Sequence, residues 1–471
     1  MLLSSTHLVS LALTLLLVSS IGAAAARKVK NANDFTLGGN SSGSVLVAGT
    51  IIGTIAGGSA TIGTAQLAFV FGLSAWWFTL GAGVALLIMA AFYARPLRAS
   101  ALQTIPQFLT LHFGAAAGPI ASAAASIGIF FSIVSNLLAA TPLTAAILAL
   151  DGIQALLLVL LLVICYVFFG GVWGTGLVGV VKTGLLFLSL GGVWLAAYDG
   201  MDGWSGYRAA LPPFPWFSLA GRGVWVDAAS GLSLIVGTLT TQTYIQALYA
   251  AKDEKTARNG ALLAALVTLP TGIPAVMAGM YMRIHYPQIA PIDALPLFIL
   301  GQLPPWLGGI ALATLLLAAV GSAAGLALGV SAMVSRDIVA AKWRLSDAAM
   351  LRVNRLAVLF VTLLAALFCL GNLHSLVLEW NFLSMGLRGA GIFLPLTLAI
   401  FLPGRVGGPA AVASMLAGVA AVLIWRLVFP DFFDPLYAGL LSSLSALLLM
   451  QAKSQFRRRR AGSRSEGGTG K

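Results

Sequence analysis

Long apolar runs separated by polar segments are the main pattern of the chain. About 20 residues cross the hydrocarbon core of a bilayer as a helix, and thirteen runs approach or exceed that length. They lie at residues 6–26, 45–71, 75–93, 116–139, 153–169, 174–197, 227–249, 259–283, 306–333, 353–371, 380–402, 408–429 and 433–451. This pattern predicts an all-α polytopic membrane protein with about 13 transmembrane helices.

The run at residues 45–71 differs from an ordinary spanning helix. Its centre, GTIAGGSAT at 53–61, holds three glycines and three hydroxyl residues. A glycine costs roughly 1 kcal/mol in a helix interior, and unwound backbone at membrane depth is tolerated only where it is buried in protein or lines a cavity. A glycine-interrupted apolar segment therefore indicates the binding site of a transporter. The alternative is a continuous helix whose small residues allow close packing.

Composition excludes a soluble protein. The chain is 59% hydrophobic and 9% charged, which leaves too little polar surface for a soluble domain of this size. The net charge of +13 fits basic loops beside anionic lipid, and no nucleic-acid partner is expected. Cys165 and Cys369 lie in apolar runs, where free thiols are usual. The sequence has no phosphate-binding loop and no metal-ligand spacing among its histidines, so neither an enzyme nor a bound cofactor is expected.

The distribution of basic residues predicts the topology. The run at 6–26 has the apolar centre of a signal peptide, but its basic residues follow it, at Arg27, Lys28 and Lys30. That order favours a retained helix with its N-terminus outside. In this orientation 21 of the 27 Lys and Arg residues lie in inside loops and helix ends. We therefore expect a multi-pass protein of the inner (plasma) membrane with a cytoplasmic C-terminus.

Short motifs in a fixed order resemble the sodium–solute symporter family over nearly the whole chain. They are DFTLGG at 34–39, GLSAWWF at 72–78, TIPQFL at 104–109, HFG at 112–114, Tyr166 with Gly170 and Gly171, QALYAAKDEKTAR at 246–258, YP at 286–287, DALP at 293–296, LP at 303–304 and SRDI at 335–338. The resemblance implies a LeuT-like fold, in which two inverted five-helix repeats alternate access around a midplane site.

On that resemblance the chain divides into six parts. They are an N-terminal extra helix and loop at 1–44, a first repeat at 45–197, an extracytoplasmic loop at 198–226, a second repeat at 227–402, two C-terminal helices at 403–451 and a basic disordered tail at 452–471.

The resemblance also implies a sodium site made of oxygen ligands, as hard cations prefer. Its backbone carbonyls and its hydroxyl would belong to Gly53, Ala56, Ala318 and Ser322. Three oxygen donors that are usual in the family are replaced in this chain by Gly179, Gly321 and Ala324. Na⁺ is therefore the coupling ion by resemblance, but its site is weakened.

Lys182 lies in the apolar run at 174–197, one helical turn after Gly179. A charge inside a span is costly and by default marks function. In some Na⁺-independent transporters of the same broad fold, a lysine on the corresponding helix occupies the sodium position. We therefore hypothesise that the ammonium group of Lys182 replaces sodium, with its proton cycling or its charge locking the site. The alternative is a lysine that lines water or extends to one face.

Arg388 is the second costly charge, inside the run at 380–402. A guanidinium binds a carboxylate in bidentate fashion, so Arg388 is expected to bind an anionic solute or to form an outer gate with Glu379. The alternative is a purely structural pair. Further solute contacts are expected from midplane polar side chains at Ser59, Thr61, Gln66, Asn136, Thr241, Gln242 and Tyr244. Bonds to their own helices, or between packed helices, are the competing explanation for these groups.

Together these features predict a secondary active transporter of a small polar, preferably anionic, solute. Its partners are the solute, a coupling cation (Na⁺ or H⁺) and the lipid bilayer. A proton-coupled or Na⁺-independent transporter that uses Lys182, and a solute sensor that does not transport, stay as alternatives.

Overall fold

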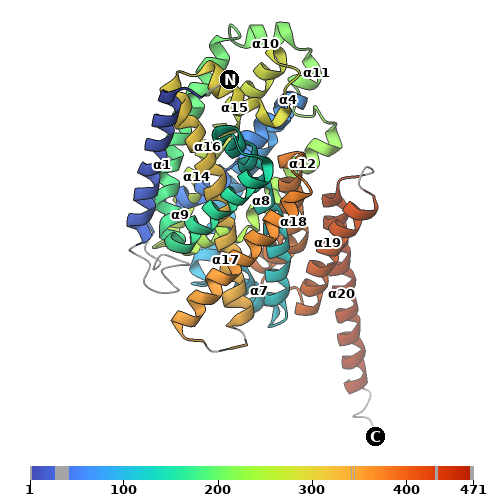
Figure 1. Cartoon of the computed structure of the whole chain (residues 1–471). Helices are drawn as coiled ribbons and strands as arrows, with labels where there is room; N and C mark the ends of the chain where they lie inside the picture. The colour runs from blue at the N-terminus through green and yellow to red at the C-terminus, as the bar shows by residue number, and fades with distance from the viewer. Residues whose placement is uncertain (1–2, 27–41, 341, 344, 430–432, 467–471) are drawn as a thin grey trace.

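The computed structural model (Figure 1) describes residues 3–26, 42–340, 342–343, 345–429 and 433–466. Within these ranges, the side chains of 23–26, 168–178 and 455–466 are not described. The DFTLGG motif at 34–39 and the end of the tail at 467–471 also lie outside the described residues. The described chain is helical, and an isolated β-bridge pairs Ser42 with Ala251.

The helical elements follow one another along the chain with short connections. Their order is α1 (Ser5–Ala26), α3 (Ser44–Ile55), η2 (Ser59–Gly63), α4 (Thr64–Phe71), η3 (Gly72–Trp76), α5 (Trp77–Ile88), η4 (Met89–Tyr93), α6 (Ala94–Ala99), α7 (Ile105–Phe113), α8 (Ala117–Leu148), α9 (Gly152–Asp199), α10 (Trp204–Ala210), α11 (Pro213–Trp216), α12 (Val224–Leu239), α13 (Gln242–Tyr249), α14 (Glu254–His285), η5 (Pro291–Asp293), α15 (Ala294–Gln302), α16 (Pro305–Met333), η6 (Val334–Val339), α17 (Asp347–Leu370), α18 (Val377–Phe401), α19 (Gly408–Val428) and α20 (Pro435–Glu466).

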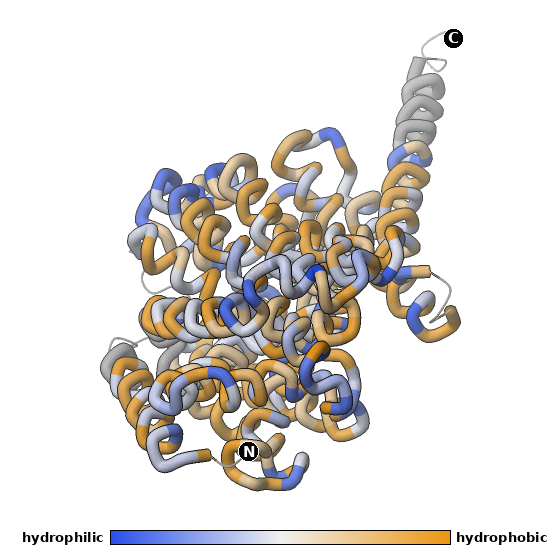
Figure 2. The backbone as a smooth tube through the Cα atoms, turned by 90° about the horizontal axis from the view of Figure 1, so that it is seen from above, coloured by the Kyte–Doolittle hydropathy of each residue, from blue (hydrophilic) through white to orange (hydrophobic). Residues whose placement is uncertain are grey.

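The predicted all-α membrane fold is confirmed. Among the described residues, 11 helical stretches are long and apolar enough to cross a membrane. One of them, Ser59–Ala99, covers the second half of the span predicted at 45–71 and all of that at 75–93. The spans predicted at 153–169 and 174–197 form one continuous helix, α9. Each predicted span therefore has a helical counterpart. Figure 2 shows these helices as mostly hydrophobic tubes, with hydrophilic residues gathered in short stretches.

The first break interrupts the helix predicted at 45–71, as its glycines indicate. The backbone leaves the helical region at Ala56 (φ −76°, ψ 63°), and helix resumes as the π-helical turn η2. A Cβ atom at Gly57 would lie 2.4 Å from Ser322 Oγ, and one at Gly58 would lie 2.4 Å from Ala139 Cβ. The glycines therefore let the unwound segment lie directly against α8 and α16. The break is buried in protein, as unwound backbone at this depth must be.

A second break interrupts the helix predicted at 227–249. The backbone is non-helical at Thr240 (φ −112°, ψ 8°) and Thr241 (φ −82°, ψ 115°), between α12 and α13. The sequence predicts a polar cluster in a span here but no interruption, because the two glycines of this span, Gly231 and Gly237, are isolated. The two breaks fall in the first helix of each predicted repeat, where interrupted helices are expected in an inverted-repeat transporter.

Two flanking units lie on opposite sides of the bundle (Figure 1). On one side, α1 packs against α9 and α16, and a Cβ atom at Gly309 would lie 2.0 Å from Ser10 Oγ. On the other side, α19 and α20 form a hairpin against α18. α20 continues to Glu466, past the predicted end at residue 451, so the predicted disordered tail begins as helix.

Candidate functional site

Lys182 extends from α9 to the first break. Its ammonium group donates a hydrogen bond to the carbonyl oxygen of Gly53 and a second one, of 3.3 Å, to that of Ala318 on α16. Ser322 donates to the same Gly53 oxygen at 3.2 Å. The lysine is buried, with 1% of its surface exposed. The cation of Lys182 therefore contacts the Gly53 and Ala318 carbonyls predicted for sodium; Ala56 is not among its described hydrogen-bond partners.

At Gly179, packing leaves no room for the oxygen donor that the family resemblance implies. α9 touches α3 at Gly179, where a Cβ atom would lie 2.4 Å from the carbonyl oxygen of Gly49, so an aspartate cannot fit. A Cβ atom at Gly321 would lie 3.5 Å from both Lys182 Nζ and the hydroxyl of Tyr166. A serine there would direct its hydroxyl into the space that the ammonium group uses. Close packing therefore excludes the donor at Gly179, whereas the Cβ position of Gly321 is at ordinary contact distance from Lys182 and Tyr166.

A hydrogen-bonded network joins η2 to α8 and α18. The hydroxyl of Ser59 accepts from Asn381 Nδ2 at 2.9 Å and bonds to the hydroxyl of Ser135 at 2.7 Å. Ser135 donates in turn to the carbonyl of Val377 at 2.9 Å. Asn381 Oδ1 is buried without a described hydrogen-bond partner. This network therefore retains one free acceptor beside the first break.

Arg388 lies deeper in the bundle, where α8 and α18 meet the second break. Nη1 donates to Thr241 Oγ1 at 2.8 Å, and Nη2 donates to the hydroxyls of Ser132 and Ser384, each at 2.9 Å. The side chain is 0% exposed, and no carboxylate is among its partners in the described part of the chain. Glu379, one predicted partner, is exposed and does not contact it. A buried charge that is surrounded only by neutral groups favours an anion.

Three predicted solute contacts also have roles inside the fold. Thr61 donates to the carbonyl of Gly57 at 2.9 Å, within its own segment. Gln66 Oε1 accepts from the first backbone N–H of α18 at 3.0 Å. Asn136 Oδ1 accepts from the N–H of Gly58 at 3.0 Å and so caps the unwound segment. As solute contacts, all three stay predictions.

Several site residues were missed by sequence reasoning. Ser135, Asn381 and Ser384 bind the groups described above but stand in runs that read only as apolar helix. A usable signal was present, because Asn381, Ser384 and Arg388 recur three and four residues apart and so share one face of α18.

Tyr244, which was predicted, is buried near Arg388. No cluster of three metal-binding side chains occurs among the described residues.

Gln242, a predicted solute contact, is engaged at the basic end of the bundle, which we define by the helix ends and connections that carry Arg95, Arg98, Lys252, Arg336 and Arg405. Its Oε1 accepts from the N–H of Ile105 at 2.9 Å, and its Nε2 donates to the carbonyl of Gln103 at 3.2 Å. Thr104 donates to the buried carboxylate of Asp337 at 2.8 Å. α13 and η6 therefore hold the N-terminus of α7 at this end.

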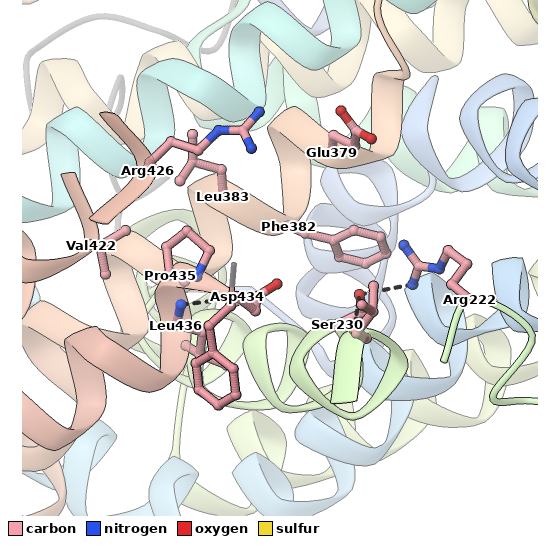
Figure 3. A pocket seen from close by; sticks show the side chains of 13 residues that line it. Arg222, Ser230, Glu379, Phe382, Leu383, Val422, Arg426, Asp434, Pro435 and Leu436 are labelled. Carbon is pink, nitrogen blue, oxygen red and sulfur yellow. Dashed lines mark hydrogen bonds between the residues drawn. The ribbon is translucent and has the colours of Figure 1, made fainter. Parts of the chain in front are cut away.

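A pocket of about 260 Å³ opens at the other end, between α12, α18 and the α19–α20 hairpin (Figure 3). Arg222 forms an ion pair with Asp227 at 2.6 Å and lies over the ring of Phe382, 5.2 Å from its centroid. Burial raises the pKa of Asp434, which also lines the pocket, although nearby arginines oppose this shift. None of the residues that bind Arg388 lines the pocket, so it is separate from the buried site.

Comparison with known proteins agrees with the fold. The model of the sodium:solute symporter family matches residues 35–418. The osmoregulated proline transporter OpuE of Bacillus subtilis is 24% identical over 488 residues, which cover 96% of each chain. The high-affinity choline transporter 1 of Caenorhabditis elegans is 22% identical, over 93% of this chain and 84% of that one.

Two solved structures share the architecture. A Na⁺-coupled sialic acid symporter, in a substrate-bound outward-open state, has a TM-score of 0.80 at 19% identity and covers 94% of this chain and 96% of its own. Mhp1, a nucleobase-cation-symport-1 family transporter in a closed conformation, has a TM-score of 0.60 at 13% identity, over 89% of this chain and 95% of its own. The chain therefore belongs to the sodium:solute symporter family, and it is a multi-pass membrane transporter rather than an enzyme.

Proposed function

We propose that this transporter moves a small anionic solute by alternating access, with Lys182 in the place of sodium and a proton as the coupling ion. The observation that carries the proposal is the position of the Lys182 ammonium group. It donates to the carbonyls of Gly53 and Ala318, which the family resemblance predicts as sodium ligands. Sodium coupling is the family's usual mode and is the competing proposal.

A tethered ammonium group and a sodium ion differ in how they leave the site. Both are cations that bind carbonyl oxygens, but Lys182 stays attached to α9 and can release only its proton. Loss of the proton removes the charge that draws α3 and α16 towards α9. Uptake of a proton from one side of the membrane and release to the other then supplies a coupling cycle. If Lys182 instead keeps its proton throughout the cycle, its charge locks the site and transport is independent of Na⁺.

The anionic character of the solute is inferred from the second break. Arg388 has neutral partners there, and a guanidinium binds a carboxylate in bidentate geometry. The N-terminus of α13 starts beside Thr241 and adds positive potential at the same place. The relatives include a proline transporter, a choline transporter and a sialic acid symporter, so family membership alone selects no solute. A small carboxylate fits the local charge best.

The test is uptake into proteoliposomes, screened over carboxylates, amino acids and sugars, with sodium and proton gradients imposed separately. We expect uptake of a carboxylate that follows the proton gradient and is indifferent to sodium. Uptake driven only by sodium would overturn the role of Lys182 and restore the family's coupling. Solute binding without uptake under either gradient would instead favour a sensor.

We also propose an orientation with the N-terminus outside and the basic end in the cytoplasm of a bacterial-type cell. α1 begins at the end of the bundle opposite to the one from which α20 extends (Figure 1). The excess of Lys and Arg at the basic end supports this choice, because positively charged loops stay on the cytoplasmic side.

A further inference from the structure

A cavity of about 740 Å³ lies on the flank of the bundle, between α8, α16, α17 and α19. We call it the α17 groove. Its walls are hydrocarbon and aromatic apart from Ser126, and they include Ile127, Phe131, Val330, Leu356, Phe360 and Leu364. A polar solute would lose its hydrogen bonds to water here and gain almost none in return. The groove is therefore not a second site for the transported solute.

The α17 groove is open to the bilayer. Leu356 is 63% exposed and Phe360 is 69% exposed, although both line the cavity. In a membrane, exposed apolar walls of this kind contact lipid chains. The volume is large enough for a chain segment to lie inside the groove instead of only passing over it.

At the basic end of the groove, the apolar wall is followed by a positively charged side chain. Arg352, Leu356 and Phe360 recur every four residues, so they form one stripe along α17. Arg352 is exposed and Arg355 is half-buried, both within a turn of the first apolar wall residues. Trp343 is 56% exposed in the preceding connection, and tryptophan is typical of the headgroup level of a membrane.

We propose that the α17 groove binds an anionic phospholipid of the adjacent leaflet, with one acyl chain in the groove and its phosphate against Arg352. Charge complementarity selects an anionic over a zwitterionic headgroup. Arg336, on the same end, interacts with Asp337 and Asp347 and is already compensated. The exposed Arg352 therefore forms the positive rim, and the apolar wall beside it supplies the site for the chain.

The lipid would contact the helix that carries half of the cation site. Val330 and Val334 of the α16–η6 segment line the groove, while Ala318 and Ser322 of the same helix face the first break. A bound acyl chain fills the space between this segment and α17. The occupied groove therefore restrains movement of α16 at the basic end.

The experiment is a titration of purified full-length protein with phosphatidylglycerol or phosphatidylcholine, followed by native mass spectrometry of the bound lipid. We expect a saturable phosphatidylglycerol site with at least fivefold preference over phosphatidylcholine. Arg352→Gln should weaken phosphatidylglycerol binding about fivefold, since a basic residue near anionic lipid contributes about 1 kcal/mol. Ala357→Trp, which fills the groove, should abolish the site for both lipids.

Two matched variants serve as controls. Arg405→Gln removes an exposed charge elsewhere on the basic end, and Leu367→Trp enlarges an exposed residue of α17 that does not line the groove. Both should bind phosphatidylglycerol like the unmodified protein. Equal affinity for the two lipids, or unchanged binding in Ala357→Trp, would overturn the proposal. So would a dimer that Ala357→Trp dissociates while lipid binding persists, because the groove would then hold a second copy of the chain.

Discussion

At the scale of single residues, Lys182 and Arg388 define two positive centres, one at each break. Each cation contacts a different broken helix: Lys182 binds the carbonyl of Gly53, and Arg388 binds the hydroxyl of Thr241. Two backbone carbonyls accept from Lys182, whereas three hydroxyls, one backbone carbonyl and a thioether sulfur accept from Arg388. We propose that the first centre holds the coupling charge and that the second binds a solute anion that arrives and leaves.

Replacement of Lys182 tests the first centre. In Lys182→Ala we expect proton-driven uptake to fall at least tenfold and its dependence on pH to flatten, because the coupling charge is gone. Uptake by proteoliposomes at several pH values measures both effects. Lys453→Ala, an exposed lysine on α20, is the matched control and should transport normally. Unchanged uptake and pH profile in Lys182→Ala would refute the coupling role.

Replacement of Arg388 tests the second centre. Hydrogen bonds to charged groups contribute about 1.5–3 kcal/mol, so Arg388→Gln should weaken solute binding roughly 10- to 100-fold. Arg388→Lys keeps the charge but loses the bidentate geometry, and its affinity should lie between the two. The concentration dependence of uptake gives these values. If Arg388 is only structural, the solute affinities of the unmodified protein, Arg388→Lys and Arg388→Gln will not follow this order. Both variants would then lose thermal stability without a selective loss of affinity.

A third residue-scale prediction concerns the contact of α9 with α3. Gly179→Ala places a methyl group 2.4 Å from the carbonyl oxygen of Gly49, and overpacking of this kind costs about 1–3 kcal/mol. Gly191 lies on the same helix with nothing within 4 Å of its virtual Cβ atom, so Gly191→Ala is the control. Thermal unfolding in detergent should show a lower midpoint for Gly179→Ala only. Equal midpoints would mean that α9 does not pack tightly on α3.

At the scale of elements, the two breaks show what a sequence can and cannot predict. Three glycines in nine residues make the first break visible, because glycine disfavours a helix by itself. The second break has no such local cause. Thr241 has extended backbone angles and Gln242 begins α13. Their side chains bind Arg388 and the α7 segment, which are distant in sequence and so give no local signal.

The same reasoning explains which site residues were found. Gly53, Ala318 and Ser322 were predicted because the family resemblance fixes their positions along the chain. Lys182 was found because a charge in an apolar run is conspicuous. Ser135 and Asn381 were not, since a single hydroxyl or amide in a helix commonly bonds to its own backbone and has no evident partner in the sequence.

The contact between α13 and α7 gives an element-scale prediction. Gln242→Ala removes two hydrogen bonds that hold the N-terminus of α7, each contributing about 1 kcal/mol. The basic end should then open more often. We expect Gln103→Cys, in a background without Cys165 and Cys369, to react roughly tenfold faster with a membrane-impermeant maleimide when Gln242 is also replaced by Ala.

A glutamine at the other end of the bundle provides the control for that measurement. Gln154 caps the exposed start of α9, so Gln154→Ala should leave the labelling rate unchanged. Equal rates with and without Gln242 would show that the α7 contact does not limit opening. Faster labelling in both variants would indicate general loosening of the fold instead of release of one contact.

At the scale of the whole molecule, the structure joins the flanking helix α1 to the transport bundle. Ser10 contacts Gly309 so closely that no side chain fits at that glycine, and His7 lies against Gly308. Removal of α1 would expose this surface of α16 to lipid. α16 also carries the Ala318 carbonyl that Lys182 binds. This packing supports a retained first helix, in agreement with the order of charges around it.

The topology prediction follows from the same packing. With α1 retained, an epitope tag at the N-terminus should be accessible from outside intact cells, whereas a fluorescent protein after residue 471 should fold and fluoresce in the cytoplasm. The physical reason is the concentration of 21 of the 27 basic residues in inside loops and helix ends. A tag that disappears from the mature protein would show cleavage after the first apolar run. A tag that is detected only after permeabilisation would show the opposite orientation. The basic end, where α7 is held by α13, would then lie on the external side.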